Sequence, residues 1–534
     1  MSYETGTANN YLDFLDKLDA FLCNQGHAWG KTYAGTGNGT ISAYIGTATS
    51  VTEMFTITAI NATTFSVVGS VSGALANATV GTPYTSAKIN FTITAGGTAF
   101  VAGDVFTLQT TPAWSRLRYT GCVGEGYRSG TGWSADSNHA HTKAFDDIYS
   151  STHARSLTSP AYLNIELFKA DQIARFALIN GDSTTVTVKD VSLQWSNDGV
   201  SWTNLQTWTG LTWIQTSERK DFTVTSPVSR RFWRLELTCQ TGQTTLRVGE
   251  VEFYNSMTAL YQLEDRFGFM WKAPGLDGTK DIYVGGYTYQ VPGSNIHNLV
   301  FSGSRYWDAT LAVTAQQNPS GIRTLPLNNQ SFTYHFFANG QRAIIVATPG
   351  GSWESAYLGF GLPYETPTIH PFPLIVGACS GAQDQLLTDT DADHRAFWNA
   401  GGSGTTTPIR AIAAYYPDNV WRMIANRDQS GGASDGFGST GTFGYTYPWA
   451  TNDGGVLLTD IRDQIDGGFP LIPGMILHTF GGVTHAWGEF DGLYFTPGFN
   501  NSAGTLINYG GFDHLVIKNI TRSNTQDFAA IRID

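Results

Sequence analysis

Short stretches in which apolar and polar residues alternate, separated by glycine-containing turns, recur along the chain. In VSLQWSNDGVSWTNLQTW, residues 191–208, Val191, Leu193 and Trp195 alternate with polar residues ahead of Asp198-Gly199. A period of two indicates a strand with one buried face, and Asp-Gly suits a tight turn because glycine tolerates positive φ. We therefore predict a β-hairpin here, with Trp195 and Trp202 in its core.

The composition agrees with a β-rich chain. Its 534 residues include 60 glycines and 13% aromatic residues, and only 14% are charged, where about a quarter is usual. This length predicts two to four domains. Low charge and many aromatics are also typical of surfaces that contact other proteins. The expected fold class is mainly β and multi-domain, with antiparallel β-sandwich or jelly-roll modules and a short N-terminal amphipathic helix.

Residues 10–22, NYLDFLDKLDAFL, are the expected helix. Their apolar residues follow one stripe while aspartates and a lysine face away, and Asn9 or Asn10 suits the N-cap. A single amphipathic helix needs a surface to pack on. Its own domain is the expected surface, and a neighbouring subunit is the alternative.

Shifts in composition divide the chain into four parts. Residues 35–112 contain almost no charge and many short β-branched runs, so they are predicted to be an all-β module inserted into a surface loop. The other expected parts are an N-terminal helix and the start of an assembly domain over 1–34, a β-sandwich over 113–256, and a β-rich assembly region over 257–534.

Bulk properties argue against several classes of function. The net charge of −12 does not favour nucleic-acid binding, which needs clustered lysine and arginine. No run approaches the roughly 20 apolar residues of a membrane span, and the N-terminus lacks the features of a signal peptide. The cysteines, at 23, 122, 239 and 379, have neither metal-ligand spacing nor the density of a disulfide framework. Synthesis in the cytoplasm, with reduced thiols, is expected.

Four motifs in the third part resemble the discoidin, or coagulation-factor type C, family, which includes many carbohydrate-binding modules. They are KAFDD (143–147), PAYLNIEL (160–167), LQWSNDGVSW (193–202) and GEVEFY (249–254). Their order and spacing match the family over roughly 115 residues. The resemblance implies an antiparallel jelly-roll sandwich whose ligand site, where one exists, lies in the loops at one end.

The same resemblance implies two candidate sites. Asp146 and Asp147, with Glu250 from the last strand, are candidates for a structural calcium, which prefers clustered oxygen ligands. Asp147 replaces the family's usual glycine, so a hydrogen-bonded turn without metal is the alternative. The candidates for carbohydrate contact are Trp133, His139, His141, Tyr149 and Arg155. The alternative for these five residues is an interface with a neighbouring subunit.

Other segments resemble virion proteins of tailed bacteriophages. One is the β-module that includes GTISAYIGTATS, and another is SAYLGFGLPYETPTIHPFPLIVGACSG (355–381). A third is GEFDGLYFTPGFNNSAGTLI (488–507), together with the ending DFAAIRID. Because they coincide in one chain, they imply a component of a phage particle and little about mechanism.

No motif gives strong support to catalysis. His139-Ala-His141 with Asp136 lacks the third ligand that a catalytic zinc needs. The sequence around Cys379, GACSG, has the form of a nucleophile elbow without a clear following helix. Asp389-Thr-Asp391-Ala-Asp393 lacks the glycine and glutamate of an EF-hand. Glu489 and Asp491 would share a face of a strand, but nothing else identifies a glycosidase pair.

These patterns favour a non-enzymatic virion component at the tail tip, baseplate or fibre-attachment region. It would form a homo-oligomeric ring, three-fold or six-fold, dock other virion proteins, and contact host surface glycan through the discoidin-like part. We expect no cofactor apart from the candidate calcium, no nucleic acid and no membrane insertion. The alternatives are a phage depolymerase with a carbohydrate-binding module and a head or neck decoration protein.

Overall fold

The computed structural model describes residues 2–117, 124–134, 144, 153–256, 261–264, 268–275, 281–290, 296–308, 316–364, 374–379, 412–415, 420–424, 443–447, 468–480, 483–518 and 528–533. The chain forms two compact units. Unit 1 combines Met1–Leu117 with Phe269–Asp534, and unit 2 is Arg118–Gly268. Nearly all regular structure in the described residues is strand, in several antiparallel sheets, which confirms the mainly β, multi-domain prediction.

Helix α1 (Tyr11–Cys23) is the predicted N-terminal helix. The Asn10 side chain caps it by accepting hydrogen bonds from the backbone N–H groups of Leu12 at 3.0 Å and Asp13 at 2.9 Å. Its apolar stripe is buried against strands of unit 1, where the Phe14 ring contacts Phe332 and Phe336. The helix therefore packs on its own domain, and its apolar stripe is not available to a neighbouring subunit.

Unit 1 is built on one large sheet that joins the N-terminal strand to the C-terminal half of the chain. Strand β1 pairs with β26, more than 320 residues later, from Ser2 opposite Ala338 to Ala8 opposite Phe332. The strands, in spatial order, are β1 (Ser2–Ala8), β26 (Phe332–Ala338), β27 (Arg342–Ala347), β28 (Glu354–Phe360), β30 (Leu374–Gly377), β31 (Ile412–Tyr415), β32 (Trp421–Ile424), β33 (Phe443–Tyr447), β34 (Ile472–Phe480), β35 (Val483–Phe495), β38 (Phe528–Arg532), β37 (Phe512–Lys518) and β36 (Leu506–Tyr509), with β29 (Leu362–Pro363) paired to β35.

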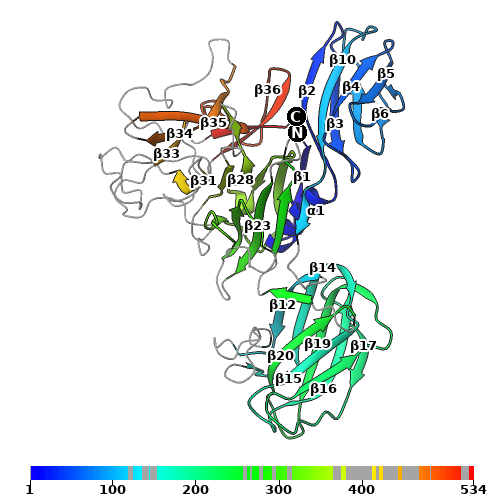
Figure 1. Ribbon diagram of the computed structural model, residues 1–534, viewed down its shortest axis with the longest axis vertical. Helices are drawn as coiled ribbons and strands as arrows, with labels where there is room; N and C mark the ends of the chain where they lie inside the picture. The colour runs from blue at the N-terminus through cyan, green and yellow to red at the C-terminus, as the bar shows by residue number, and fades with distance from the viewer. Residues whose placement is uncertain are drawn as a thin grey trace. The chain divides into compact units, whose positions relative to one another are not determined.

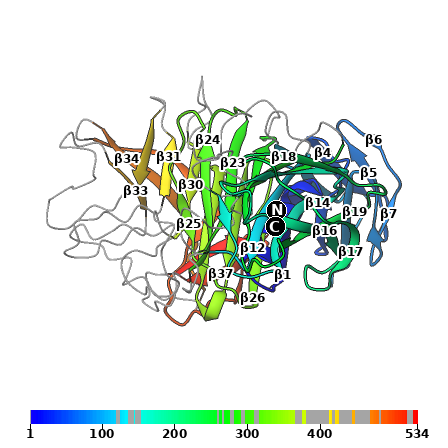
Figure 2. The ribbon, with the colours of Figure 1, turned by 90° about the horizontal axis from the view of Figure 1, so that it is seen from below.

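A five-stranded sheet covers part of this large sheet. It consists of β11 (Ser115–Leu117), β22 (Gly268–Ala273), β23 (Ile282–Gln290), β24 (His297–Ser304) and β25 (Arg323–Leu325). Figure 2 shows β23 and β24 beside β30, in agreement with the contacts of β24 with β30 and of β23 with β28. The short 3₁₀ turn η3 (Pro349–Gly351) links β27 to β28.

The low-charge segment of unit 1, residues 35–112, forms a small sandwich together with the preceding strand β2, and we call residues 27–112 the inserted module. One sheet contains β2 (His27–Ala34), β10 (Val105–Thr111), β4 (Glu53–Ala59), β5 (Thr64–Gly69), β6 (Gly73–Ala74) and β7 (Ala78–Thr79), and the other contains β3 (Thr40–Gly46), β9 (Ile89–Thr94) and β8 (Pro83–Tyr84). Aromatic and β-branched residues from both sheets form the core between them. Figure 1 shows this module in blue.

Unit 2 is a sandwich of two sheets with a hydrophobic core between them (Figure 1, cyan to green). The six-stranded sheet has the order β17 (Thr203–Trp208), β16 (Val188–Ser196), β19 (Ser229–Cys239), β14 (Ala161–Gln172), β12 (Gly124–Thr131) and β21 (Tyr261–Glu264). The four-stranded sheet has the order β13 (Ala154–Arg155), β20 (Arg247–Tyr254), β15 (Arg175–Asn180) and β18 (Arg219–Thr223).

Two further sequence expectations concern thiols and membranes. Cys239 and Cys23 are half-buried and Cys379 is buried, and all three are free thiols. Across the described residues, none of the helices has the length and apolar character needed to cross a bilayer.

Candidate functional site

The predicted hairpin of unit 2 is present, with β16 and β17 as its strands. At its turn, the Asp198 carboxylate accepts hydrogen bonds from the backbone N–H groups of Ser201 at 2.7 Å and Val200 at 2.8 Å. These two bonds, and a third from the Ser196 hydroxyl, hold the pKa of Asp198 well below its usual value. Gly199 has a φ of 72°, the left-handed conformation that favours glycine. The predicted turn at Asp198-Gly199 is present, but the connection is longer than a tight turn, because residues 197–202 separate β16 from β17.

The two tryptophans beside this turn occupy different environments. Trp195 is partly buried and packs against the core of unit 2. Trp202 lies outside that core, and its ring is covered on the outer face of the sheet by the Arg234 guanidinium, 4.4 Å from the ring centroid. The prediction that Trp202 belongs to the core is therefore wrong. The turn interrupts the alternation, since Val200 is 79% exposed.

One end of the sandwich holds Arg155, which is one of the residues that the discoidin resemblance singles out. Strand β13 pairs with β20, which places Arg155 opposite Arg247. The backbone N–H of Ser134 donates to the Arg155 carbonyl at 2.9 Å. Ser134 therefore lies at this end of the sandwich together with Arg155.

Arg247, Asp182 and His153 are joined by ion-pair contacts, and Arg155 lies opposite Arg247 in the strand pairing; we call these four residues the Arg155 cluster. Arg247 Nη1 lies 2.6 Å from Asp182 Oδ1, and His153 Nε2 lies 3.6 Å from the same oxygen. Burial alone would raise the pKa of Asp182, but Arg247 and His153 hold it below the usual value. Asp182 has 40% of its side chain exposed and Arg155 is exposed. The cluster thus offers water-accessible donors beside a charged acceptor.

The five candidate carbohydrate residues have different places. Arg155 lies in the cluster just described. Trp133 is 8% exposed and belongs to the core of unit 2, and its indole N–H donates to the Tyr162 carbonyl at 2.8 Å. It therefore offers little ring surface for stacking. His139, His141 and Tyr149 lie outside the described residues.

The candidate calcium ligands are only partly described. Glu250 is on β20 and is 2% exposed. Asp146 and Asp147 lie outside the described residues. Within the described part of the chain no three histidine, cysteine or acidic residues come together as metal ligands would. The calcium site stays a prediction.

Comparison with solved structures finds similarity to carbohydrate-binding and discoidin-type modules over about a quarter of the chain. A pectin-binding carbohydrate-binding module matches with 20% identity and a TM-score of 0.21, covering 26% of this chain and 94% of that one. A family 32 module from Clostridium perfringens NanJ, in complex with galactose, matches with 18% identity and a TM-score of 0.20, covering 24% of this chain and 92% of that one. The F5/8 type C domain of a Bacteroides fragilis protein matches with 13% identity and a TM-score of 0.21, covering 26% and 95%. Neither a family model nor a curated protein matches this sequence.

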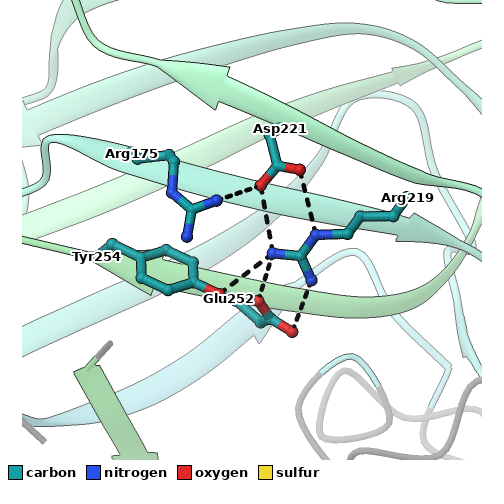
Figure 3. A network of polar contacts seen from close by, with 5 residues as sticks. All are labelled: Arg175, Arg219, Asp221, Glu252 and Tyr254. Carbon is teal, nitrogen blue, oxygen red and sulfur yellow. Dashed lines mark hydrogen bonds and ion pairs between the residues drawn. The ribbon is translucent and has the colours of Figure 1, made fainter. Parts of the chain in front are cut away.

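A second polar network of unit 2, on the four-stranded sheet, joins side chains of three strands to one another (Figure 3). Arg219 bonds both oxygens of Glu252, at 2.9 and 2.7 Å, and also Asp221, which accepts from Arg175 at 2.6 Å. The Arg175 guanidinium lies 3.7 Å from the ring centroid of Tyr254. These pairs bridge β18, β15 and β20, so we interpret the network as a cross-strand brace rather than a ligand site.

The residues of unit 1 considered for catalysis are engaged or buried. Cys379 is 1% exposed, whereas a nucleophile elbow presents its nucleophile to substrate. The Asp491 carboxylate accepts from Asn339 at 2.7 Å, Gln341 at 3.1 Å and Arg342 at 3.2 Å. These three donors make Asp491 an anchor of the β26–β27 hairpin.

Glu489, two residues before Asp491, accepts a hydrogen bond from the Tyr364 hydroxyl at 3.1 Å. Burial raises the pKa of the Glu489 carboxyl, whereas the donors around Asp491 lower that of its carboxyl despite burial. Opposite shifts of this kind occur in glycosidase pairs. Here one partner is held by three protein groups, so the pair does not by itself indicate hydrolysis.

Proposed function

We propose that this chain is a non-catalytic structural component of a tailed-phage virion, at the tail tip, baseplate or fibre-attachment region. In this proposal unit 1 forms the assembly scaffold with copies of itself and with other virion proteins. Unit 2 is a recognition module that contacts a glycan on the host surface. The observation that carries the recognition role is the Arg155 cluster, at the end of a sandwich where the discoidin motifs predict a ligand site.

The chemistry of the Arg155 cluster suits a sugar. Arginine offers several N–H donors in fixed geometry and a carboxylate offers acceptor oxygens, and neighbouring sugar hydroxyls can pair with both. Arg155 is exposed, and Asp182 keeps 40% of its side chain accessible while Arg247 holds it in place. In such sites a small number of polar groups, held by a rigid scaffold, usually fix the orientation of the ligand.

The virion role is supported by sequence. Three separate segments of unit 1 resemble phage particle proteins, and two of them contribute the strands β28 and β35 of its large sheet. Immunoelectron microscopy with antibodies against unit 2 tests the location. Label at the distal tail is expected. Label on the head or neck would favour a decoration protein, and free chain without label on particles would contradict the virion role.

Binding of the full chain to immobilised host envelope polysaccharide tests the recognition role. Arg155→Ala and Asp182→Ala are each expected to weaken binding about tenfold or more, since each removes a charged hydrogen-bonding group. Lys189→Ala, a half-exposed position on the opposite sheet of unit 2, is the matched control and should bind as the natural chain does. Equal binding by all variants would contradict the assignment. Release of reducing ends from the polysaccharide would instead support the depolymerase alternative.

A further inference from the structure

The outer face of the larger sheet in the inserted module carries no charged side chain. Strands β2, β10, β4 and β5 lie side by side (Figure 1). Their register places Thr32, Thr107, Thr56 and Val68 in one row across the four strands. The residues on either side of this row are also neutral. We call the whole set the neutral face, and its members, all exposed or half-exposed, are Thr32, Ala34, Met54, Thr56, Thr58, Ser66, Val68, Val105, Thr107 and Gln109.

The rest of the inserted module is almost as poor in charge. Residues 35–112, all of them described, contain only Glu53, Lys88 and Asp104 as charged residues. Glu53 is 3% exposed and Asp104 is 2% exposed, and both are bonded to backbone N–H groups of nearby loops. Lys88 is therefore the one charged side chain of residues 35–112 at the surface. Lys31, on β2, is half-exposed, and its ammonium group lies over the Phe512 ring, 5.3 Å from the ring centroid.

This composition is unlike that of a surface that stays in water. A soluble surface commonly carries roughly 25–35% charged residues. Depletion of charge is instead the mark of the buried centre of a protein interface. Met54 and Val68 are 43% and 42% exposed on the neutral face, which adds apolar area to it. These features indicate that the neutral face is covered in the functional assembly.

The absence of charge on the neutral face also restricts which kind of surface can cover it. A charged partner surface would lose hydration on contact and gain no ion pair in return. The partner surface is therefore itself neutral, and every further copy of this chain brings such a surface. Two sheets can pack face to face through the side chains of alternate residues.

We propose that the neutral face is a self-association surface, which packs against the neutral face of a second copy of the chain. This inference rests on the assembly role proposed above and names the surface that serves it. Ten residues are fewer than the roughly 20–30 per side of a stable interface. A single contact is therefore weak, and because a face that packs on its own copy closes at two chains, we expect a concentration-dependent dimer through this face.

Charge placed on the neutral face tests the proposal. Val68→Lys and Val68→Glu are made in the full chain, and sedimentation velocity is followed over a concentration series. Each variant alone is expected to self-associate at least about tenfold more weakly than the natural chain, because like charges then meet across the contact. An equimolar mixture of the two variants should recover association, because opposite charges then meet. Thr94→Lys and Thr94→Glu, at an exposed position on the other sheet of the module, are the matched controls.

Three outcomes would overturn the proposal. If the Val68 variants associate like the natural chain, the neutral face is not the contact, and the assembly role stands without it. If each variant loses association and the mixture does not recover it, the face docks on a different surface. If the natural chain stays monomeric at every concentration, the assembly role fails as well. Thermal unfolding of each variant, expected to match the natural chain because Val68 is exposed, separates these outcomes from misfolding.

Discussion

Arg342 donates a hydrogen bond from Nε to the Asp491 carboxylate at 3.2 Å, and this contact ties β27 to β35 inside unit 1. The Arg342 side chain is fully buried and that of Asp491 is 17% exposed. Such a pair stabilises a fold mainly in the sense that losing one partner leaves the other charge buried and unpaired. The ion pair therefore fixes the position of β27 relative to β35.

Replacement of Arg342 by methionine is expected to lower the free energy of unfolding of unit 1 by about 3 kcal/mol. Arg342 also helps to hold the pKa of Asp491 below its usual value against the opposing effect of burial. The stabilisation by Asp491 is thus present above its unfolded pKa and is lost as pH falls through the folded pKa. In the Arg342→Met variant that loss should occur at higher pH. Urea unfolding between pH 3 and pH 7 measures both effects, and an unchanged pH profile would contradict the pairing.

Glu354 provides the opposite pH dependence. Its side chain is 0% exposed, and burial raises its pKa to about 8 against the smaller lowering effect of a hydrogen bond with the Cys379 thiol. The stabilisation is complete below the unfolded pKa, near 4.5, and is lost as pH rises to about 8. One pKa unit corresponds to about 1.4 kcal/mol, so the effect reaches a few kcal/mol.

Glu354→Gln removes this titration. Its free energy of unfolding should vary less between pH 5 and pH 8 than that of the natural chain, and it should be higher at pH 8. Chemical unfolding at several pH values measures the slope. Glu236→Gln, a half-exposed position in unit 2, is the control. Parallel curves for the natural chain and Glu354→Gln would show that Glu354 is not the titrating group.

Trp202 and Trp233 should respond very differently to replacement by alanine. Trp233 is 0% exposed in the core of unit 2, so Trp233→Ala is expected to cost about 3–5 kcal/mol. Trp202 stacks on Arg234 at the surface, and Trp202→Ala should cost only about 0.5–1 kcal/mol. Chemical unfolding of both variants, with far-UV circular dichroism, gives the comparison. Equal losses of unfolding free energy in the two variants would indicate that Trp202 belongs to the core.

Local patterns predicted the elements of the fold, as α1 and the 191–208 hairpin illustrate. Helical periodicity with Asn10 at the cap, and alternation with Asp198-Gly199 at the turn, are both encoded within a few residues. The environment of Trp202 was not predictable in the same way. The turn breaks the period of two, and the position of Arg234 over the ring depends on a strand 30 residues later.

Features that depend on pairing between distant segments could not be predicted from the sequence, for the same reason. Nothing near Ser2 indicates that β1 pairs with β26, and nothing near Glu354 indicates that its carboxyl is enclosed. Within the candidate site, Arg155 is the residue that the discoidin resemblance predicted. The pairing of β13 with β20 then brings Arg247 opposite Arg155, and Arg247 holds Asp182. Neither Arg247 nor Asp182 stands out in sequence, because each is a single charged residue in a strand or loop.

The Asp104 carboxylate joins two loops of the inserted module. Asp104 accepts hydrogen bonds from the backbone N–H groups of Thr36 at 2.8 Å, Gly37 at 3.0 Å and Val101 at 3.0 Å, and from the Tyr33 hydroxyl at 3.1 Å. Burial opposes ionisation, but these donors lower the pKa of Asp104 to about 2. The contribution of Asp104 to stability is complete above its unfolded pKa, near 3.8, and is lost as pH falls toward 2.

Asp104→Asn replaces one acceptor oxygen with an N–H₂ group that cannot accept from the loop amides. The amides of Thr36 and Gly37 should therefore exchange with solvent faster in this variant, while the amides of unit 2 in the same molecule keep their natural rates. Hydrogen exchange at pH 7 measures this directly. At pH 3 the natural chain should begin to lose protection at the same two amides. The Asp104→Asn variant should show no further loss, because the variant has no carboxylate at this position to protonate. Unchanged exchange of Thr36 and Gly37 at pH 7 would mean that the backbone pairing of the strands, and not Asp104, closes the loop.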